Sequence, residues 1–178
     1  MLLKKKQEYM KFSDLTYKIV AFSEIENFNS DDCIDWAYEM LLLGYHSENL
    51  LILAGISKPS QFFEVKEYLK KTLQELNIKI LGKDDAILSY STYYIKKIAA
   101  SENIEQNLKL IHTFCQDNDN TIVFDFSRLY WAWDDFKNGE EYTHYWENAN
   151  RHTIRQIIIE FAKDWLSKNK KEIERITL

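Results

Sequence analysis

Glycine and proline are scarce in this sequence, and their scarcity limits the folds that the chain can adopt. Of the 178 residues, only four are Gly and one is Pro. A β-sandwich or a β-barrel needs many tight turns, and tight turns draw on these two residues for their backbone conformations. The composition therefore favours long helices joined by short loops.

Apolar residues recur at intervals of three and four along most of the chain, which is the spacing of one helical face. This spacing predicts about eight helices, which begin near Ser13, Ser30, Ser47, Ser60, Asp84, Asn103, Ile122 and Asn150. Short loops between helices imply antiparallel neighbours. We therefore expect an all-α fold of antiparallel hairpins, arranged either as an irregular bundle or as a short α-solenoid of the HEAT type.

Two of these segments carry more specific expectations. The spacing of Leu15, Ile19 and Phe22 predicts one amphipathic helix over residues 13–26. The segment at residues 48–57, ENLLILAGIS, has almost no polar residue to form a solvent-facing side. Its composition predicts a helix that is buried on most sides.

The domain organisation and the location of the protein follow from what the sequence lacks. No Gly/Ser-rich linker or change of composition divides the chain, so we expect a single helical domain over residues 1–178 with a flexible N-terminal segment at 1–12. The first residues, MLLKKKQEYM, contain no apolar stretch as long as a signal peptide or a membrane span. These features predict a cytoplasmic protein with no membrane partner.

The chain also lacks the common motifs of catalysis and cofactor binding. It contains no G-x-x-x-x-G-K-[ST], G-x-G-x-x-G, G-x-S-x-G, H-E-x-x-H or Cys-x-x-Cys pattern, so we expect no enzyme and no cofactor. The formal net charge is -5, which disfavours nucleic acid as a partner because phosphate binding needs concentrated positive charge. Cys33 and Cys115 lie in apolar helical surroundings and are expected to be reduced and buried.

One histidine offers an alternative to a non-enzymatic protein. If residues 140–147 were helical, Glu140, His144 and Glu147 would share one face at a spacing that suits a divalent metal. Carboxylates and histidines at such spacings are also common on solvated helices, so we assign no metal site. A metal-dependent enzyme built on these three residues is kept as an alternative function.

The most unusual stretch of the sequence is residues 130–147, YWAWDDFKNGEEYTHYWE, which mixes aromatic rings with carboxylates. Asp134 and Asp135 fall near the end of a predicted helix, where the helix dipole disfavours negative charge. A local conflict of this kind is typical of functional surfaces. Trp133 and Phe136 match the apolar face of the helix and are expected to point into the core.

Exposed aromatic rings with a charged rim are typical of protein interfaces. We therefore predict a binding site for a protein with a basic surface, because carboxylates steer such a partner toward them. The predicted site consists of Trp131, Asp134, Asp135, Glu140, Glu141, Tyr142, Tyr145, Trp146 and Glu147. The alternative is that these rings only seal one end of the core.

Two stretches of the chain also resemble known proteins. Residues 35–59, DWAYEMLLLGYHSENLLILAGISKP, and residues 129–146, LYWAWDDFKNGEEYTHYW, are similar to small acidic bacterial proteins, some of which resemble immunity proteins encoded beside polymorphic toxins. The resemblance implies inhibition by binding, in which an acidic protein occludes the active site of a toxin, often a basic nuclease. We therefore expect a non-enzymatic protein that neutralises a bacterial toxin by direct binding, with a helical scaffold or regulatory subunit as the alternative.

Overall fold

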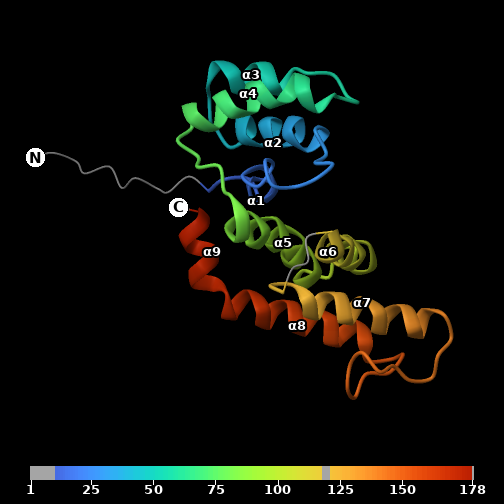
Figure 1. Cartoon of the computed structure of the whole chain (residues 1–178). Helices are drawn as coiled ribbons and strands as arrows, with labels where there is room; N and C mark the ends of the chain where they lie inside the picture. The colour runs from blue at the N-terminus through green and yellow to red at the C-terminus, as the bar shows by residue number, and fades with distance from the viewer. Residues whose placement is uncertain (1–10, 118–120, 178) are drawn as a thin grey trace, which may run out of the picture. The chain divides into compact units, whose positions relative to one another are not determined.

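The computed structural model describes residues 11–117 and 121–177, and all regular secondary structure in this part of the chain is helical (Figure 1). The predicted all-α class is therefore confirmed. Of the N-terminal segment expected at residues 1–12, residues 1–10 lie outside the described residues. The helices of the described part are α1 (Thr16–Ile19), α2 (Asp31–Leu42), α3 (Glu48–Ala54), α4 (Phe62–Glu75), α5 (Lys83–Ala99), α6 (Ile104–Asp117), α7 (Phe124–Lys137), α8 (Ile154–Lys168) and α9 (Lys170–Thr177).

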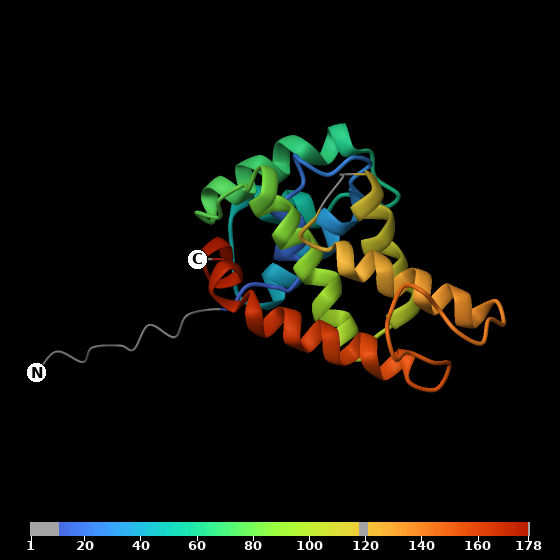
Figure 2. The same ribbon diagram turned by 60° about the horizontal axis from the view of Figure 1, so that its bottom comes forward.

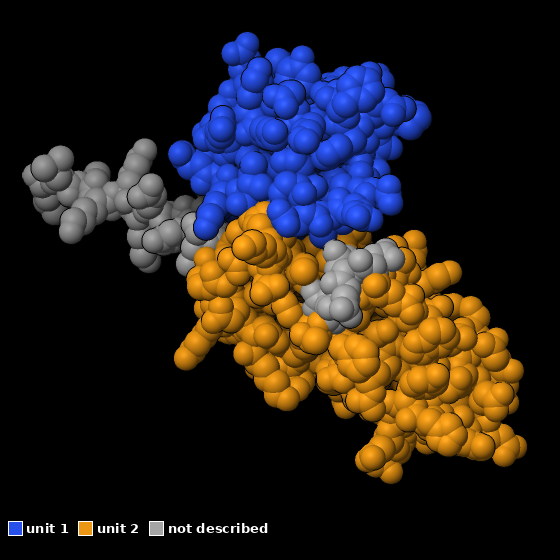
Figure 3. Space-filling model, viewed as in Figure 1, with its two compact units in different colours: residues 1–80 blue, residues 81–178 orange. Residues whose placement is uncertain are grey.

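The chain divides into two compact units, residues 1–80 and residues 81–178, which Figure 3 shows in separate colours. Unit 1 contains α1 to α4, and unit 2 contains α5 to α9. Each unit has buried apolar side chains of its own. The single helical domain expected over residues 1–178 stays a prediction.

Unit 1 is built from successive helices that pack in chain order, α1 on α2, α2 on α3 and α3 on α4. The indole nitrogen of Trp36 donates a hydrogen bond of 2.9 Å to Oγ1 of Thr16 and so joins the first two helices. The helix over 31–42 ends where the sequence predicts, because Gly44 adopts a φ of +89° and lets the amide of Tyr45 reach the carbonyl of Met40 at 3.0 Å. The largest fully buried core side chains of these helices are Ile19, Trp36, Met40, Leu50, Leu53, Leu69 and Leu73.

The helix predicted over residues 13–26 is wrong in its length. Only Thr16–Ile19 is α-helical, and the chain continues as turns in which the amide of Ala21 donates to Lys18 and that of Phe22 to Ile19. Five consecutive residues, 18–22, are buried. A regular amphipathic helix buries one side only, so tighter turns replace it where every successive side chain enters the core.

The prediction for residues 48–57 is correct in its helix and wrong in its burial. Ser47 caps α3, since its hydroxyl accepts a hydrogen bond of 3.2 Å from the amide of Leu50. Leu50 and Leu53 are fully buried, whereas Leu51 is 57% exposed and Ile52 is 40% exposed. Packing against α2 and α4 covers one side of this short helix, and apolar composition alone does not cover the other.

Unit 2 is a closed arrangement of helices. Helix α5 packs against both α6 and α8, α6 packs against α7, and α7 packs against α8, so the four helices form a ring of neighbours. The C-terminal helix α9 lies against α5, where Arg175 donates a hydrogen bond of 2.6 Å to Asp85. Of the two arrangements that the sequence leaves open, the bundle describes this unit. In Figure 2 the chain between α7 and α8 forms a long loop at one end of these helices.

Both cysteines are buried, as predicted, and no disulfide bond joins them. Burial, together with the charge of Asp32, raises the pKa of the Cys33 thiol to about 12, so this thiol stays protonated at neutral pH. Among the residues that the structure describes, no helix combines the length and apolar character that crossing a membrane requires.

Candidate functional site

Helix α7 carries two tryptophans that lie on opposite sides of it. Residues two apart in an α-helix are separated by about 200° around its axis. Trp131 is 38% exposed, whereas Trp133 is half-buried and borders the side that faces the core. That side buries Phe126, Leu129, Ala132 and Phe136. The inward position predicted for Phe136 is confirmed, and Trp133 lies at the edge of the core.

The end of α7 determines the course of the chain through the predicted site. Gly139 adopts a φ of +99°, a conformation that a side chain would disfavour. The amide of Glu140 then donates to the carbonyl of Asp135 at 3.0 Å, and that of Gly139 donates to Phe136 at 3.3 Å. These two bonds form the Schellman motif that ends a helix. Residues 140–147 consequently form a loop and not a continuation of the helix.

Asp135 holds this loop against α7. Its carboxylate accepts a hydrogen bond of 2.7 Å from the hydroxyl of Thr143, and the same hydroxyl accepts one of 3.2 Å from the amide of Tyr145. The side chain of Asp134 accepts a hydrogen bond of 3.0 Å from the amide group of Asn138. Both carboxylates are half-buried. The unfavourable position of these charges at a helix end is thus offset by hydrogen bonds to groups that follow the helix.

Aromatic contacts fix the loop at a second point. The rings of Trp131 and Tyr145 are stacked, with centroids 6.1 Å apart and planes inclined by 27°. Tyr142 meets the ring of His144 edge-on at 5.2 Å. Tyr142 is 65% exposed and Tyr145 is 40% exposed, so these rings present much of their area to solvent.

The predicted site residues separate into two groups in the structure. Trp146 is half-buried, packs edge-on against Phe161 at 5.2 Å and lies under the guanidinium of Arg128 at 5.5 Å. Like Asp134 and Asp135, it makes contacts within unit 2 that stabilise the fold. The exposed group, which we call the acidic aromatic surface, consists of Trp131, Glu140, Glu141, Tyr142, Tyr145 and Glu147.

The buried side chain of His112 packs against Trp131 of the acidic aromatic surface. Its ring is stacked on Tyr130 with centroids 4.3 Å apart, and it meets Trp131 edge-on at 5.0 Å. One ring nitrogen lies 2.7 Å from the hydroxyl of Ser127. Burial lowers the pKa of His112 below its ordinary value, and the charge of Asp134 opposes that shift only in part.

A cavity of about 630 Å³ lies beside the stacked pair of Trp131 and Tyr145. Its wall also includes Phe124, Ser127 and Arg128. A hollow of this size next to exposed rings offers space for a side chain of a bound partner.

The arrangement that would hold a metal is not formed. Because residues 140–147 are a loop, Glu140, His144 and Glu147 do not lie on one helical face. Within residues 11–117 and 121–177, no group of three or more His, Cys, Asp or Glu side chains has a geometry suited to a metal ion.

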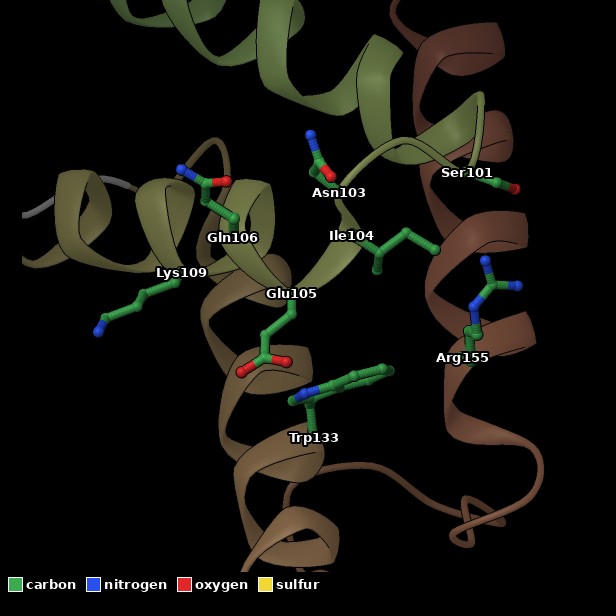
Figure 4. A pocket seen from close by; sticks show the side chains of 8 residues that line it. All are labelled: Ser101, Asn103, Ile104, Glu105, Gln106, Lys109, Trp133 and Arg155. Carbon is green, nitrogen blue, oxygen red and sulfur yellow. The ribbon is translucent and has the colours of Figure 1, made fainter.

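Sequence reasoning missed a second set of residues in unit 2, which gathers around Trp133. A cavity of about 550 Å³ next to this ring is lined by side chains that include Glu105, Lys109 and Arg155 (Figure 4). One signal was available in the sequence. Arg155 stands in the first turn of α8, which has no acidic residue to complement the helix dipole.

No protein-family model matches the chain, and neither a curated protein nor a solved structure is significantly similar to it.

Proposed function

We propose that this chain is a non-enzymatic protein-binding protein that uses the acidic aromatic surface to hold a partner with a basic surface. The observation that carries the proposal is the exposure of Trp131 on α7 and of Tyr142 and Tyr145 on the following loop, which internal contacts hold in place. Covering exposed rings with a partner removes apolar surface from water, which lowers the free energy of the complex. Aromatic side chains are also the residues most often responsible for binding energy at protein interfaces.

Charge gives the proposed surface its preference among partners. Glu140, Glu141 and Glu147 are exposed around the rings, and no hydrogen bond or ion pair to another described residue engages their side chains. Such carboxylates attract a basic surface at long range and repel an acidic one. The partner is therefore expected to present Lys or Arg around an apolar centre.

The particular function that we propose is that of an immunity protein, which neutralises a bacterial toxin by occupying its basic active site. The acidity of the chain and the acidic aromatic surface support this proposal. It was suggested by residues 35–59 and 129–146, which resemble small acidic bacterial proteins, some of which resemble immunity proteins. Neutralisation by occlusion requires affinity for the toxin and a shape complementary to its active site. It requires no catalytic step from this chain.

The test co-expresses this chain with candidate toxin domains encoded by neighbouring genes and measures cell survival together with the affinity of the purified proteins. We expect protection from the wild type and weaker binding, by at least tenfold, after Tyr142→Ala or Glu141→Lys. Phe63→Ala is the matched control, because Phe63 is 74% exposed and belongs to unit 1. Absence of both protection and binding would contradict the proposed function, and equal losses in the control would contradict the proposed site.

A further inference from the structure

A second surface of unit 2 has properties opposite to those of the acidic aromatic surface. The cavity of about 550 Å³ beside Trp133 adjoins another of about 510 Å³, and the two share Glu105, Trp133 and Arg155 in their walls. Their volumes fall within the range of roughly 300–1,000 Å³ that is usual for small-molecule sites. We call this region the Trp133 pocket.

Cationic side chains surround the Trp133 pocket from three helices and the loop before α8. They are Lys109 of α6, Lys137 of α7, Arg151 and Arg155, and Glu105 is the carboxylate among them. Glu105 forms an ion pair with Lys137, and the hydrogen bond between them raises the pKa of Lys137. The carboxylate in the pocket is therefore neutralised by one of the four cations.

The other three cations have no carboxylate partner among the described residues. Arg151 donates a hydrogen bond of 3.3 Å to the carbonyl of Gly139, which leaves its charge uncompensated. Arg155 and Lys109 form neither a hydrogen bond nor an ion pair with any side chain in the described ranges. In a chain with a net charge of -5, such a local excess of positive charge selects for an anion.

The ring of Trp133 supplies the other half of the site. In Figure 4 the indole lies between Glu105 and Arg155, whereas the side chain of Lys109 extends away from it. The indole nitrogen is buried and has no hydrogen-bond acceptor among the described residues. Buried donors of this kind are rare in folded proteins because an unmade hydrogen bond is costly. The ring also offers a flat surface on which another planar group can stack.

We propose that the Trp133 pocket binds a small molecule that joins a planar ring to a phosphate, the chemistry of a nucleoside monophosphate. The base stacks on Trp133, and the phosphate accepts hydrogen bonds from Arg155 and Arg151. Guanidinium groups suit this role because their fork of N–H donors matches the oxygens of a phosphate. The dianionic phosphate also matches the excess of positive charge better than a singly charged carboxylate does.

Isothermal titration calorimetry of the full chain with AMP, GMP, CMP and UMP tests the proposal. We expect at least one monophosphate to bind at least tenfold more tightly than its nucleoside and than inorganic phosphate. Arg155→Gln should weaken that binding about tenfold. Lys163→Gln is the matched control, since it removes one positive charge from an exposed position two turns further along α8 and should leave binding unchanged.

A second variant is expected to act in the opposite direction. Glu105→Gln removes the carboxylate of the pocket and frees Lys137, so it should tighten monophosphate binding about threefold. Because Glu105 is exposed, this substitution leaves the fold intact. The proposal is overturned if none of the four monophosphates binds, if phosphate alone binds as tightly, or if Arg155→Gln and Lys163→Gln have the same effect.

Discussion

Trp131 and Trp133 lie two residues apart on one helix, yet the side chains around them differ in charge. Trp131 stacks on Tyr145 of the loop that carries Glu140, Glu141 and Glu147. Trp133 lines a pocket in which three of four cations lack a carboxylate partner among the described residues. The comparison shows that the net charge of a chain does not determine the charge that a ligand meets at a given site.

The two tryptophans also differ in what holds them. The ring of Trp131 contacts His112, Tyr130 and Tyr145, so its position is fixed by other aromatic side chains. Trp133 makes no such ring contact among the described residues, and its nitrogen lacks an acceptor. A helix with a turn of 3.6 residues can therefore serve two separate surfaces from neighbouring positions.

Truncating a core side chain of α7 should have the largest effect on the stability of the protein. Phe126 is fully buried and meets Phe161 edge-on at 5.0 Å, so Phe126→Ala should lower the free energy of unfolding by about 3–5 kcal/mol. Chemical denaturation followed by circular dichroism measures this loss. Phe124→Ala is the matched control, because Phe124 is 56% exposed on the same helix and its loss should cost less than about 0.5 kcal/mol. Equal losses in the two variants would contradict the core assignment.

A smaller change should loosen the Trp131 side and leave the Trp133 side intact. Thr143→Val keeps the shape of the side chain but removes its hydrogen bond to Asp135, which should destabilise the loop by about 1–2 kcal/mol. Hydrogen exchange of the amides of residues 140–147 should then accelerate about 5–30-fold. Amides of α8 serve as the internal control and should not change. Acceleration in both regions would show that the two sides are not independent.

Mild acid should lower the stability of the protein through His112, whose ring contacts Trp131. The pKa of His112 is lowered in the folded protein, so the unfolded chain takes up the proton more readily. The stability associated with neutral His112 is present above pH 6.5, the ordinary value, and is lost as the pH falls through 6.5 toward the lowered pKa. The denaturation midpoint should therefore decrease between pH 7.5 and 5.5. His112→Gln should reduce this dependence, and an unchanged dependence would count against the assignment.

The smallest effect on stability is expected at the rim of the acidic aromatic surface. Glu141 is exposed, and Glu141→Lys should change the free energy of unfolding by less than about 0.5 kcal/mol. The same substitution should weaken partner binding, as proposed above. Thermal denaturation measured beside the affinity separates the two roles, and a large loss of stability would mean that Glu141 supports the fold.

Much of the helical structure could be predicted from the sequence, because it depends on the local spacing of apolar residues. Helices α4, α6 and α8 follow their predicted segments, and the caps at Ser47 and Gly44 act as their residue types suggest. The prediction was wrong for residues 13–26 and for the burial of α3, where the decisive factor is which neighbours cover the segment. Spacing along the chain carries no information about such neighbours.

Of the two surfaces of unit 2, one could be predicted from the sequence and the other could not. The residues of the acidic aromatic surface are close together in the sequence, so their unusual composition could be recognised. The Trp133 pocket takes Glu105, Lys109, Lys137, Arg151 and Arg155 from three helices and a loop. Only packing brings these side chains together. The apolar spacing predicts that Trp133 points into the core, and it could not predict that this ring also lines a cavity.

The anchoring of the loop after α7 bears on the conformational entropy of any complex formed there. A partner that binds a freely moving loop must first restrict it, at a cost of about 0.5–1.5 kcal/mol for each side chain that becomes fixed. Here the hydrogen bond from Thr143 to Asp135 and the stacking of Tyr145 on Trp131 already restrict the loop in the unbound chain. Complex formation at this surface would therefore lose little chain entropy, and even a contact of modest area could be tight.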